Sequence, residues 1–297
     1  MIWSDSLICR SKINLRLKVT ARREDGYHEL ASCFLPLENP ADTLTLTVDE
    51  TRPGLTLDAP GFPVEVEPEA NLVSKAARLF AEKSGISPCW HFELQKHIPI
   101  AAGMGGGSSN AAGVLKLLNR CYNKFSPAEL ADIAVKIGAD VPFFLLDAPA
   151  WATGIGEKLS PLPTGGRIPA VLVIAPGFPV SAKWGFTALD KKRIAPDEKD
   201  MADTAAELLA ADAPFEAWQK FCHNDLGFAI FEKFPLTALY REFLLAHRAL
   251  TVQVCGSGPS LFALFTDAET ALAAGKALRA DTLNDPVMRI FCGSEEL

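Results

Sequence analysis

The chain lacks several features that would assign it to a well-marked class of protein. It has no run approaching the roughly 20 apolar residues that a membrane helix needs. Its seven cysteines form no C-x-x-C pair and no Cys/His cluster with zinc-site spacing. Its 29 basic residues are outnumbered by 36 acidic ones, and the resulting net charge of -7 argues against a general nucleic-acid binder. We therefore expect neither a nucleic acid nor a membrane as partner.

The remaining composition is typical of a soluble, folded enzyme. Hydrophobic residues make up 48% and charged residues 22% of the 297-residue chain, which suffices for one large domain or two modest ones. Prolines and glycines interrupt the pattern around residues 160–167, so we expect domains at 1–162 and 163–297. No signal peptide is evident, and an odd, dispersed set of cysteines suits reduced thiols, so we expect a cytoplasmic protein.

The most informative stretch is a glycine-rich loop between a predicted strand and a predicted helix. Trp90, Phe92 and Leu94 alternate with polar residues, as in a half-buried strand. Apolar residues from 111 to 122 recur at three- and four-residue steps, as in a helix. Glycine permits close backbone approach, and the helix offers unpaired amides and the positive end of its dipole. Together these features predict a phosphate-binding site at Gly103, Gly105, Gly106, Gly107, Ser108 and Ser109.

Two familiar phosphate loops are excluded. No Lys-Ser or Lys-Thr pair follows the glycines, so the loop is not of the Walker A type. Ser108 stands where the dinucleotide-binding pattern requires its third glycine. A flexible surface loop without a ligand is the alternative, and it is disfavoured because Gly/Ser linkers are usually not held between a strand and a helix.

Asp140 and Lys12 are the candidates for acid–base and electrostatic chemistry. Asp140 precedes six apolar residues, which should partly remove it from water, and a placed carboxylate can accept a proton from a substrate hydroxyl. A carboxylate that caps a neighbouring turn is an equally weighted alternative. Lys12 begins the basic face of an alternating strand over 13–19. It is either solvent-facing, the commoner case for a lone lysine, or a cation that neutralises charge on a transferred phosphoryl group.

Two further segments carry candidate binding residues. Gly256, Ser257 and Gly258 lie between two predicted strands, where they form either a hairpin turn or a second loop whose amides approach a ligand. Tyr27 and His28 form a pair that could stack on and hydrogen-bond a base, although such residues commonly pack in a core. From the residues alone, the chain is predicted to be a phosphate-binding α+β enzyme.

Local signals predict further elements. Ser126, Pro127 and Glu129 indicate a helix that begins with a capping box, and Gly138 is expected to end it in the left-handed conformation. A helix is also predicted over 71–84. Towards the carboxy terminus, a β-α-β-β-α-β arrangement is predicted from strands at 170–175, 251–255, 261–265 and 287–291 and helices at 235–247 and 267–279.

The motifs resemble those of the GHMP kinase superfamily. The glycine loop is similar to its second signature, and the segment 256–260 is similar to its third. Three segments resemble more narrowly the family of 4-diphosphocytidyl-2-C-methyl-D-erythritol kinases: 12–17 (KINLRL), 25–30 (DGYHEL) and 138–143 (GADVPF). Smaller matches fall at 71–72, 154–157, 176–177 and 224–226, so the resemblance spans nearly the whole chain.

The resemblance implies a fold and an activity. The fold would have a ribosomal-S5-like amino-terminal domain that binds ATP and a ferredoxin-like carboxy-terminal domain that contributes to the substrate site. The activity would be ATP- and Mg2+-dependent phosphorylation of the 2-hydroxyl of 4-diphosphocytidyl-2-C-methyl-D-erythritol, in the non-mevalonate (methylerythritol phosphate) route to isoprenoids. The alternatives are another superfamily kinase, for homoserine or mevalonate, and an inactive nucleotide-binding relative. The active form would be a monomer or a homodimer.

The resemblance also implies roles for individual residues. Lys12 and Asp140 become the catalytic pair, with Asp140 as the base. Substrate contacts are implied for Asn14, Tyr27, His28, Lys96, Phe186, Gly256, Ser257 and Gly258. Phe186 would stack on cytosine opposite Tyr27. ATP contacts are implied for Asn71 and for Pro99, Ile100, Ala101, Ala102, Gly103, Met104, Gly105, Gly106, Gly107, Ser108 and Ser109.

The chain departs from the family pattern at a few positions. Ala101 and Ala102 replace glycines that are common just before the core of the loop, which could narrow its flexibility. Ser11 stands where alanine is usual, a small change that we expect to be harmless. No acidic residue occupies a recognisable magnesium-ligand position, so the metal ligands stay open.

Overall fold

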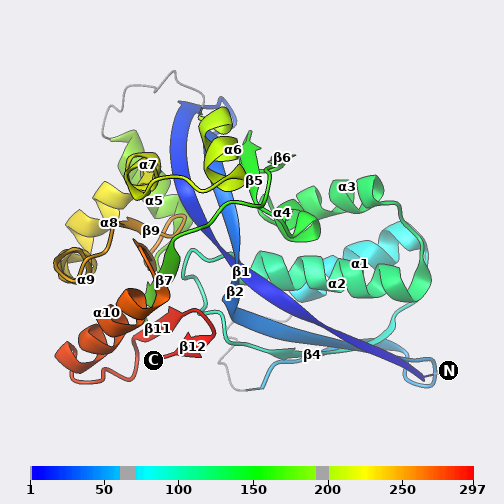
Figure 1. Cartoon of the computed structure of the whole chain (residues 1–297). Helices are drawn as coiled ribbons and strands as arrows, with labels where there is room; N and C mark the ends of the chain where they lie inside the picture. The colour runs from blue at the N-terminus through cyan, green and yellow to red at the C-terminus, as the bar shows by residue number, and fades with distance from the viewer. Residues whose placement is uncertain (1, 61–70, 192–200) are drawn as a thin grey trace. The chain divides into compact units, whose positions relative to one another are not determined.

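A computed structural model describes residues 2–60, 71–191 and 201–297, which combine helices and sheets in the predicted α+β class (Figure 1). Their contacts divide the chain into two compact units. The first comprises Met1–Ser11, Pro40–Ile98 and Gly105–Asp147, and the second comprises Lys12–Asn39, Pro99–Met104 and Ala148–Leu297. Two long strands, β1 (Ile2–Arg22) and β2 (His28–Asp49), contribute residues to both units.

The first unit packs helices against a small group of strands. Its complete elements are β3 (Gly54–Asp58), α1 (Leu72–Ser84), β4 (Cys89–Gln95), α2 (Gly106–Tyr122), α3 (Pro127–Ile137) and α4 (Val141–Leu146). β2 pairs antiparallel with β4 and brings Leu44, Leu46 and Val48 opposite Leu94, Phe92 and Trp90. All six side chains are buried, which confirms the alternation read from the sequence.

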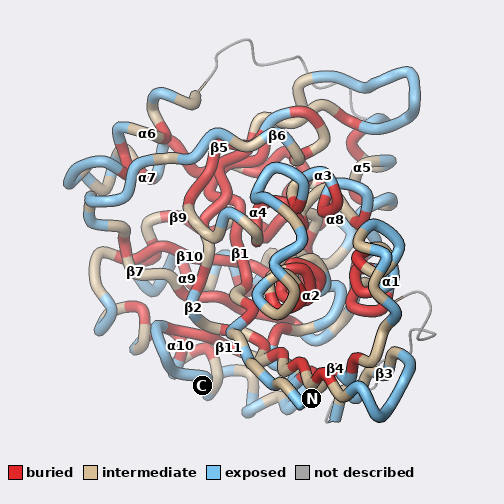
Figure 2. The backbone as a smooth tube through the Cα atoms, turned by 90° about the vertical axis from the view of Figure 1, so that its right-hand side faces the viewer, coloured by how far each residue is buried: buried red, intermediate tan, exposed pale blue. Residues whose placement is uncertain are grey.

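Helix α2 forms the centre of this unit. It lies beside α1, and Figure 2 shows it as mostly buried backbone. Gly113 lets α2 pack closely against β1 and β2, because a Cβ at this position would lie 2.8 Å from Cys9 Sγ and 3.1 Å from a methyl group of Leu44. The apolar periodicity predicted this helix, and its predicted position is confirmed.

Helix α3 begins as predicted and ends differently. The Ser126 hydroxyl accepts a hydrogen bond from Glu129 N, and the Glu129 carboxylate accepts one from Ser126 N, which confirms the capping box. The expected left-handed ending at Gly138 is wrong, because this residue is extended, with φ −178° and ψ 154°. An extended residue here turns the chain directly into α4 without a left-handed step.

The second unit contains an antiparallel five-stranded sheet. It comprises the remaining parts of β1 and β2 together with β5 (Ala150–Thr153), β6 (Lys158–Pro161), β7 (Ala170–Ala175), α5 (Ala182–Asp190), α6 (Ala202–Ala210), α7 (Phe215–Phe221), β8 (His223–Asn224), α8 (Gly227–Lys233), α9 (Pro235–Ala246), β9 (Thr251–Val254), β10 (Leu261–Phe265), α10 (Ala268–Asp281), β11 (Arg289–Cys292) and β12 (Glu295–Glu296). The strand order is β12-β11-β7-β10-β9. The predicted strands and the helices predicted at 235–247 and 267–279 are confirmed, and α5 to α8, of which α6 agrees with a helical pattern around 201–211, lie between β7 and α9.

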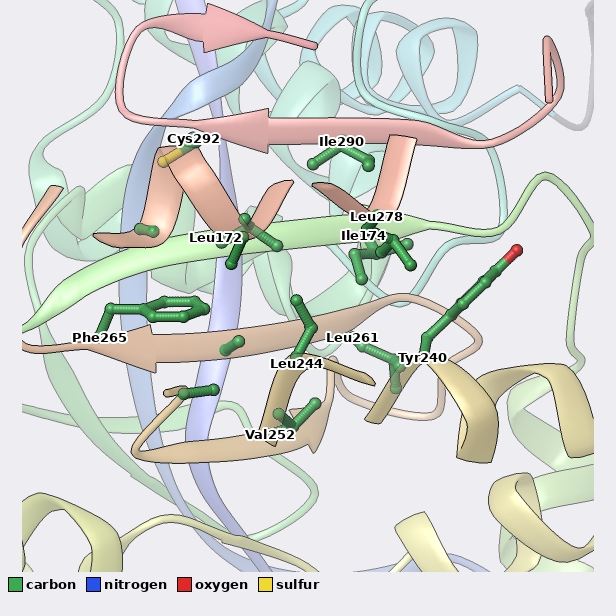
Figure 3. Packing of buried hydrophobic residues seen from close by; sticks show 14 of the residues in the cluster. Leu172, Ile174, Tyr240, Leu244, Val252, Leu261, Phe265, Leu278, Ile290 and Cys292 are labelled. Carbon is green, nitrogen blue, oxygen red and sulfur yellow. The ribbon is translucent and has the colours of Figure 1, made fainter. Parts of the chain in front are cut away.

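Apolar side chains from alternating positions of these strands form the core of the second unit. Figure 3 shows members of this cluster from β7, β9, β10 and β11 together with residues of α9 and α10: Leu172, Ile174, Val252, Leu261, Phe265, Ile290, Leu244 and Leu278. Side chains two residues apart on a strand lie on the same face of the sheet. An apolar residue at every second position of each strand therefore suffices to form this core.

The cysteines behave as core thiols. All seven lie in the described part of the chain and are free, five of them buried. Burial raises the pKa of Cys9, Cys222 and Cys255 to about 12. These thiols are therefore protonated at neutral pH. Among the described residues, every helix falls short of the length and apolar character that a membrane crossing requires.

Candidate functional site

The glycine loop connects β4 to α2 and uses left-handed backbone at alternating positions. Ala101, Gly103 and Gly105 have φ angles of 52°, 81° and 73°. Gly105 is the N-cap of α2, and no side chain makes a capping hydrogen bond there. Ala101 occupies a conformation that costs a residue with a Cβ more than it costs glycine.

Within the second unit, the middle of the loop packs against the turn that follows β9. A Cβ on Gly103 would lie 2.0 Å from the carbonyl oxygen of Cys255, so only glycine fits. Ser260 N donates a hydrogen bond to Ala102 O at 3.3 Å. The glycine segment at 256–258 therefore does more than connect β9 to β10, because the turn that contains it also contacts the first glycine loop.

Lys12 belongs to this same cluster. Its backbone N–H donates to Met104 O at 3.0 Å, and its ammonium donates to Asn14 Oδ1 at 2.8 Å and lies 5.0 Å from the centre of the Phe34 ring. A Cβ on Gly256 would lie 3.3 Å from Lys12 Nζ. Lys12 is only 4% exposed, so the solvent-facing alternative is wrong.

Asn14 holds the ammonium of Lys12 from a fixed position. Its Nδ2 donates to Ser32 Oγ at 2.9 Å, and Ser32 Oγ donates in turn to Arg16 O at 2.6 Å. Asn14 and Ser32 are buried, so this chain of hydrogen bonds sets which end of the amide meets Lys12. Asn14 therefore positions the Lys12 ammonium. Its predicted contact with substrate stays a prediction.

Asn224 is a structural residue of the cluster to which the sequence analysis assigned no role. Its Nδ2 donates to Val254 O and to Gly256 O, both at 2.8 Å, and its Oδ1 accepts from Leu226 N at 2.9 Å. It lies in β8, which pairs with β1 in parallel register. The match at 224–226 was the only signal in the sequence that pointed to it.

Asp140 lies in the first unit at the N-cap position of α4. It is half-buried, and its side chain makes no capping hydrogen bond to the helix. Capping of α4 by this carboxylate is therefore not observed, and its role as a proton acceptor stays a prediction. Asp140 and Lys12 belong to different units, and their pairing in catalysis stays a prediction.

The other predicted residues of the first unit lie around the start of α2. A Cβ on Gly107 would lie 3.3 Å from a methyl group of Leu72, the first residue of α1. Asn71 caps α1 by accepting a hydrogen bond from Val73 N at 2.9 Å. Lys96 Nζ would lie 3.2 Å from a Cβ on Gly106. The predicted ATP contact Asn71 thus adjoins the glycine loop.

Two of the three predicted base-binding residues meet in the second unit. The rings of His28 and Phe186 are stacked at 4.9 Å between centroids, and His28 Nε2 hydrogen-bonds Asp190 Oδ1 at 2.7 Å. Tyr27 is 60% exposed, which leaves its ring available for stacking. Asp190, four residues after Phe186 on α5, was missed, because only the fold brings it to His28.

Comparisons with known proteins give one consistent result. Residues 71–148 match the family model described as GHMP kinases N terminal domain. A 4-diphosphocytidyl-2-C-methyl-D-erythritol kinase from Nitratidesulfovibrio vulgaris is 37% identical over 286 residues, which cover 93% of this chain and 96% of the relative. A protein of the same name from Rhodopseudomonas palustris is 40% identical over 286 residues, 91% of each chain.

A solved structure agrees with these relatives. The crystal structure of a 4-(cytidine 5'-diphospho)-2C-methyl-D-erythritol kinase matches with a TM-score of 0.77 and 33% identity, over 97% of this chain and 98% of that one. The match therefore extends over nearly the whole of both chains.

Proposed function

The chain belongs to the 4-diphosphocytidyl-2-C-methyl-D-erythritol kinases of the GHMP kinase superfamily, and from this we propose that it transfers the γ-phosphoryl group of ATP to the 2-hydroxyl of 4-diphosphocytidyl-2-C-methyl-D-erythritol. The observation that carries the proposal is identity of 37–40% over at least nine-tenths of the chain with two relatives of that name. Homoserine and mevalonate kinases are disfavoured, because neither relative carries such a substrate in its name.

The glycine loop is proposed to hold the phosphates of ATP. Residues 99–109 combine left-handed turns with the open amino end of α2, and amides directed from such turns bind phosphate oxygens. Asn71, at the start of α1, is proposed to contact ATP as well. Phosphoryl transfer needs mainly alignment and charge neutralisation from the protein, and a rigid loop supplies the alignment.

Lys12 and Asp140 are proposed to carry the chemistry. The Asp140 carboxylate accepts the proton of the attacking hydroxyl, the new oxygen–phosphorus bond forms, and the bond to the leaving ADP breaks. The Lys12 ammonium, held by Asn14, offsets the negative charge that develops on the transferred group. Mg2+ is proposed to arrive with ATP. Among the described residues there is no cluster of three or more metal-binding side chains, and a magnesium ion on phosphates needs only one or two protein oxygens.

The cytidine end of the substrate is proposed to bind at Tyr27, His28 and Phe186. His28 and Phe186 already stack, and Asp190 fixes the imidazole by a hydrogen bond. Further substrate contacts are proposed for Asn14, Lys96, Gly256, Ser257 and Gly258, as the resemblance implies.

A division into a ribosomal-S5-like domain at 1–162 and a ferredoxin-like domain at 163–297 is also proposed. The order β11-β7-β10-β9 supports the second, because it places the four strands of a β-α-β-β-α-β unit in the order fourth, first, third, second. The protein is still predicted to be a monomer or a homodimer and to be located in the cytoplasm.

A substrate panel tests the proposed activity. Purified chain, ATP and Mg2+ are incubated with the cytidylyl-methylerythritol substrate, homoserine or mevalonate, and ADP release is followed with a coupled assay. We expect turnover with the cytidylyl substrate alone, and 31P NMR should show a new phosphate monoester on the 2-hydroxyl. Preferential turnover of homoserine or mevalonate would overturn the proposal, and so would ATP binding without turnover of any alcohol.

A further inference from the structure

A buried carboxylate, Asp42, contacts the residues of the first unit that precede and follow the glycine loop in the chain. Asp42 is 0% exposed, and its two oxygens accept four hydrogen bonds. Oδ1 accepts from His97 N at 2.7 Å and from Ile98 N at 2.8 Å. Oδ2 accepts from Asn110 Nδ2 at 2.8 Å and from the ammonium of Lys96.

These donors flank the loop on both sides. His97 and Ile98 are the last residues of the first unit before the loop, and the chain returns to that unit at Gly105. Asn110 lies in α2, one turn beyond the first helical residue, Gly106. Asp42 thus ties the beginning of the loop to the helix that follows it, from a third element, β2.

The ammonium of Lys96 completes this cluster. Besides its ion pair with Asp42, it donates to Asn110 Oδ1 at 3.2 Å. A buried carboxylate is costly unless a cation and several hydrogen bonds compensate it, and here both conditions are met. Only an ionised carboxylate offers enough acceptor sites for four donors on two oxygens, so neither asparagine nor serine can replace it.

We propose that Asp42 is a positioning residue for the nucleotide loop, joining its two ends so that the loop amides are held in place before ATP arrives. The inference rests on the proposed function, since it assigns ATP to this loop. Amides that need no rearrangement bind phosphate more tightly than a mobile loop does, because the ordering cost has already been met in folding. Asp42 would therefore act mainly on ATP affinity, and on the alcohol substrate only through its ion pair with Lys96, a proposed substrate contact.

The first test compares Asp42→Asn with Asp147→Asn. Asp147 makes ion pairs with Arg10 at 3.5 Å and Lys116 at 3.6 Å in the same unit, so its variant is a matched loss of one paired carboxylate. We expect KM for ATP to rise at least about tenfold in Asp42→Asn, and KM for the cytidylyl substrate to rise by a smaller factor, through the Lys96 ammonium that Asp42 no longer holds. Asp147→Asn should leave both constants near native values. Hydrogen–deuterium exchange should be faster over residues 96–110 in Asp42→Asn only.

If Asp42→Asn does not fold, a double variant can be tested in its place. Asp42→Asn with Lys96→Met removes the buried ion pair as a unit, which avoids an uncompensated ammonium. Its Kd for ATP and Mg2+, measured by calorimetry without the alcohol, should still rise about tenfold. A folded variant that binds ATP with native affinity would overturn the inference. If the native chain still turns over the cytidylyl substrate, the proposed function is unaffected by that result. A native chain that neither binds nor turns over ATP would overturn the proposed function, and this inference with it.

Discussion

The two compact units hold their parts of the glycine loop by different kinds of interaction. The first unit uses side-chain charge, since Asp42 accepts four hydrogen bonds, including those of the Ile98 amide and the Lys96 ammonium. The second uses close backbone packing, since a Cβ on Gly103 would lie 2.0 Å from Cys255 O. One attachment depends on ionisation, and the other depends on the absence of a side chain.

This difference predicts two kinds of sensitivity. A charge-assisted tie tolerates small changes of shape but fails when a neutral group replaces the carboxylate. A packed backbone contact is indifferent to charge but cannot accept one additional carbon atom. Substitutions of similar size should therefore have different consequences in the two units.

The largest effect is expected for the proposed catalytic charges, one from each unit. Asp140→Asn and Lys12→Met should each lower kcat on the order of a thousandfold, because the first removes the proposed proton acceptor and the second removes the cation proposed to offset charge on the transferred group. Thermal unfolding of Asp140→Asn should stay close to native, because asparagine keeps the size of the side chain at a position that is only half-buried. Steady-state ADP release measures the effect.

Asp132→Asn is the matched control for Asp140→Asn. Asp132 is an exposed carboxylate on α3 of the same unit, and its loss should change kcat less than twofold. Native-like turnover in Asp140→Asn would remove this carboxylate from the mechanism and leave Lys12 as the one proposed catalytic charge.

Added volume should act most strongly at Gly103. Gly103→Ala combines a positive φ of 81° with an overlap on Cys255 O, and we expect a loss of about 3 kcal/mol in the free energy of unfolding. Gly26→Ala is the control, because Gly26 has a nearly equal φ of 85° and no atom within 4 Å of the added carbon. It should lose only about 1 kcal/mol. Equal losses in denaturant unfolding would show that backbone strain, rather than packing, dominates in the second unit.

Local sequence patterns were sufficient to predict most of the elements. The capping box at Ser126, the helix after Asn71 and the alternating strands were predicted because each depends on residues close together in the chain. The left-handed ending at Gly138 was wrong because the extended alternative leads directly into α4, which no residue of α3 encodes.

The candidate site was predictable only where a motif marks it. The glycine loop and Lys12 were found through their patterns, whereas Asp42 and Asn224 were given no role. Asp42 lies 54 to 68 positions from its side-chain partners, and Asn224 lies 30 and 32 positions from the carbonyls it binds. Contacts of that range are set by the fold, and a single sequence carries no periodicity that records them.

Asn224 should show a moderate effect on the second unit. Asn224→Ala removes two donated hydrogen bonds and leaves the buried carbonyls of Val254 and Gly256 without this donor, so we expect a loss of about 2 kcal/mol in the free energy of unfolding. Asn39→Ala removes one exposed hydrogen bond to Glu295 O and should cost under about 0.5 kcal/mol. Similar losses in denaturant unfolding for both variants would mean that the turn after β9 is held by backbone packing alone.

The smallest effect concerns Asp225, one of the paired carboxylates of the second unit. Burial alone would raise the pKa of Asp225, but hydrogen bonds from His223 Nε2 and Val19 N, together with the charge of Lys18, bring this pKa below its ordinary value. The native state therefore binds this proton less readily than the unfolded chain does. Its contribution to stability is complete above about pH 4, the ordinary value, and is lost as the pH falls through the lowered pKa.

The difference in melting temperature between Asp225→Asn and the native protein should accordingly depend on pH. At pH 7 the variant should melt at a lower temperature, because the charge-assisted bonds to His223 and Lys18 are lost. The difference in Tm should shrink as the pH falls below about 4, where the native carboxylate becomes protonated and resembles the neutral amide. Calorimetric scans from pH 7 to pH 2 measure it. A difference that stays constant over this range would show that Asp225 stabilises the second unit through its shape, as Gly103 does, and not through its charge.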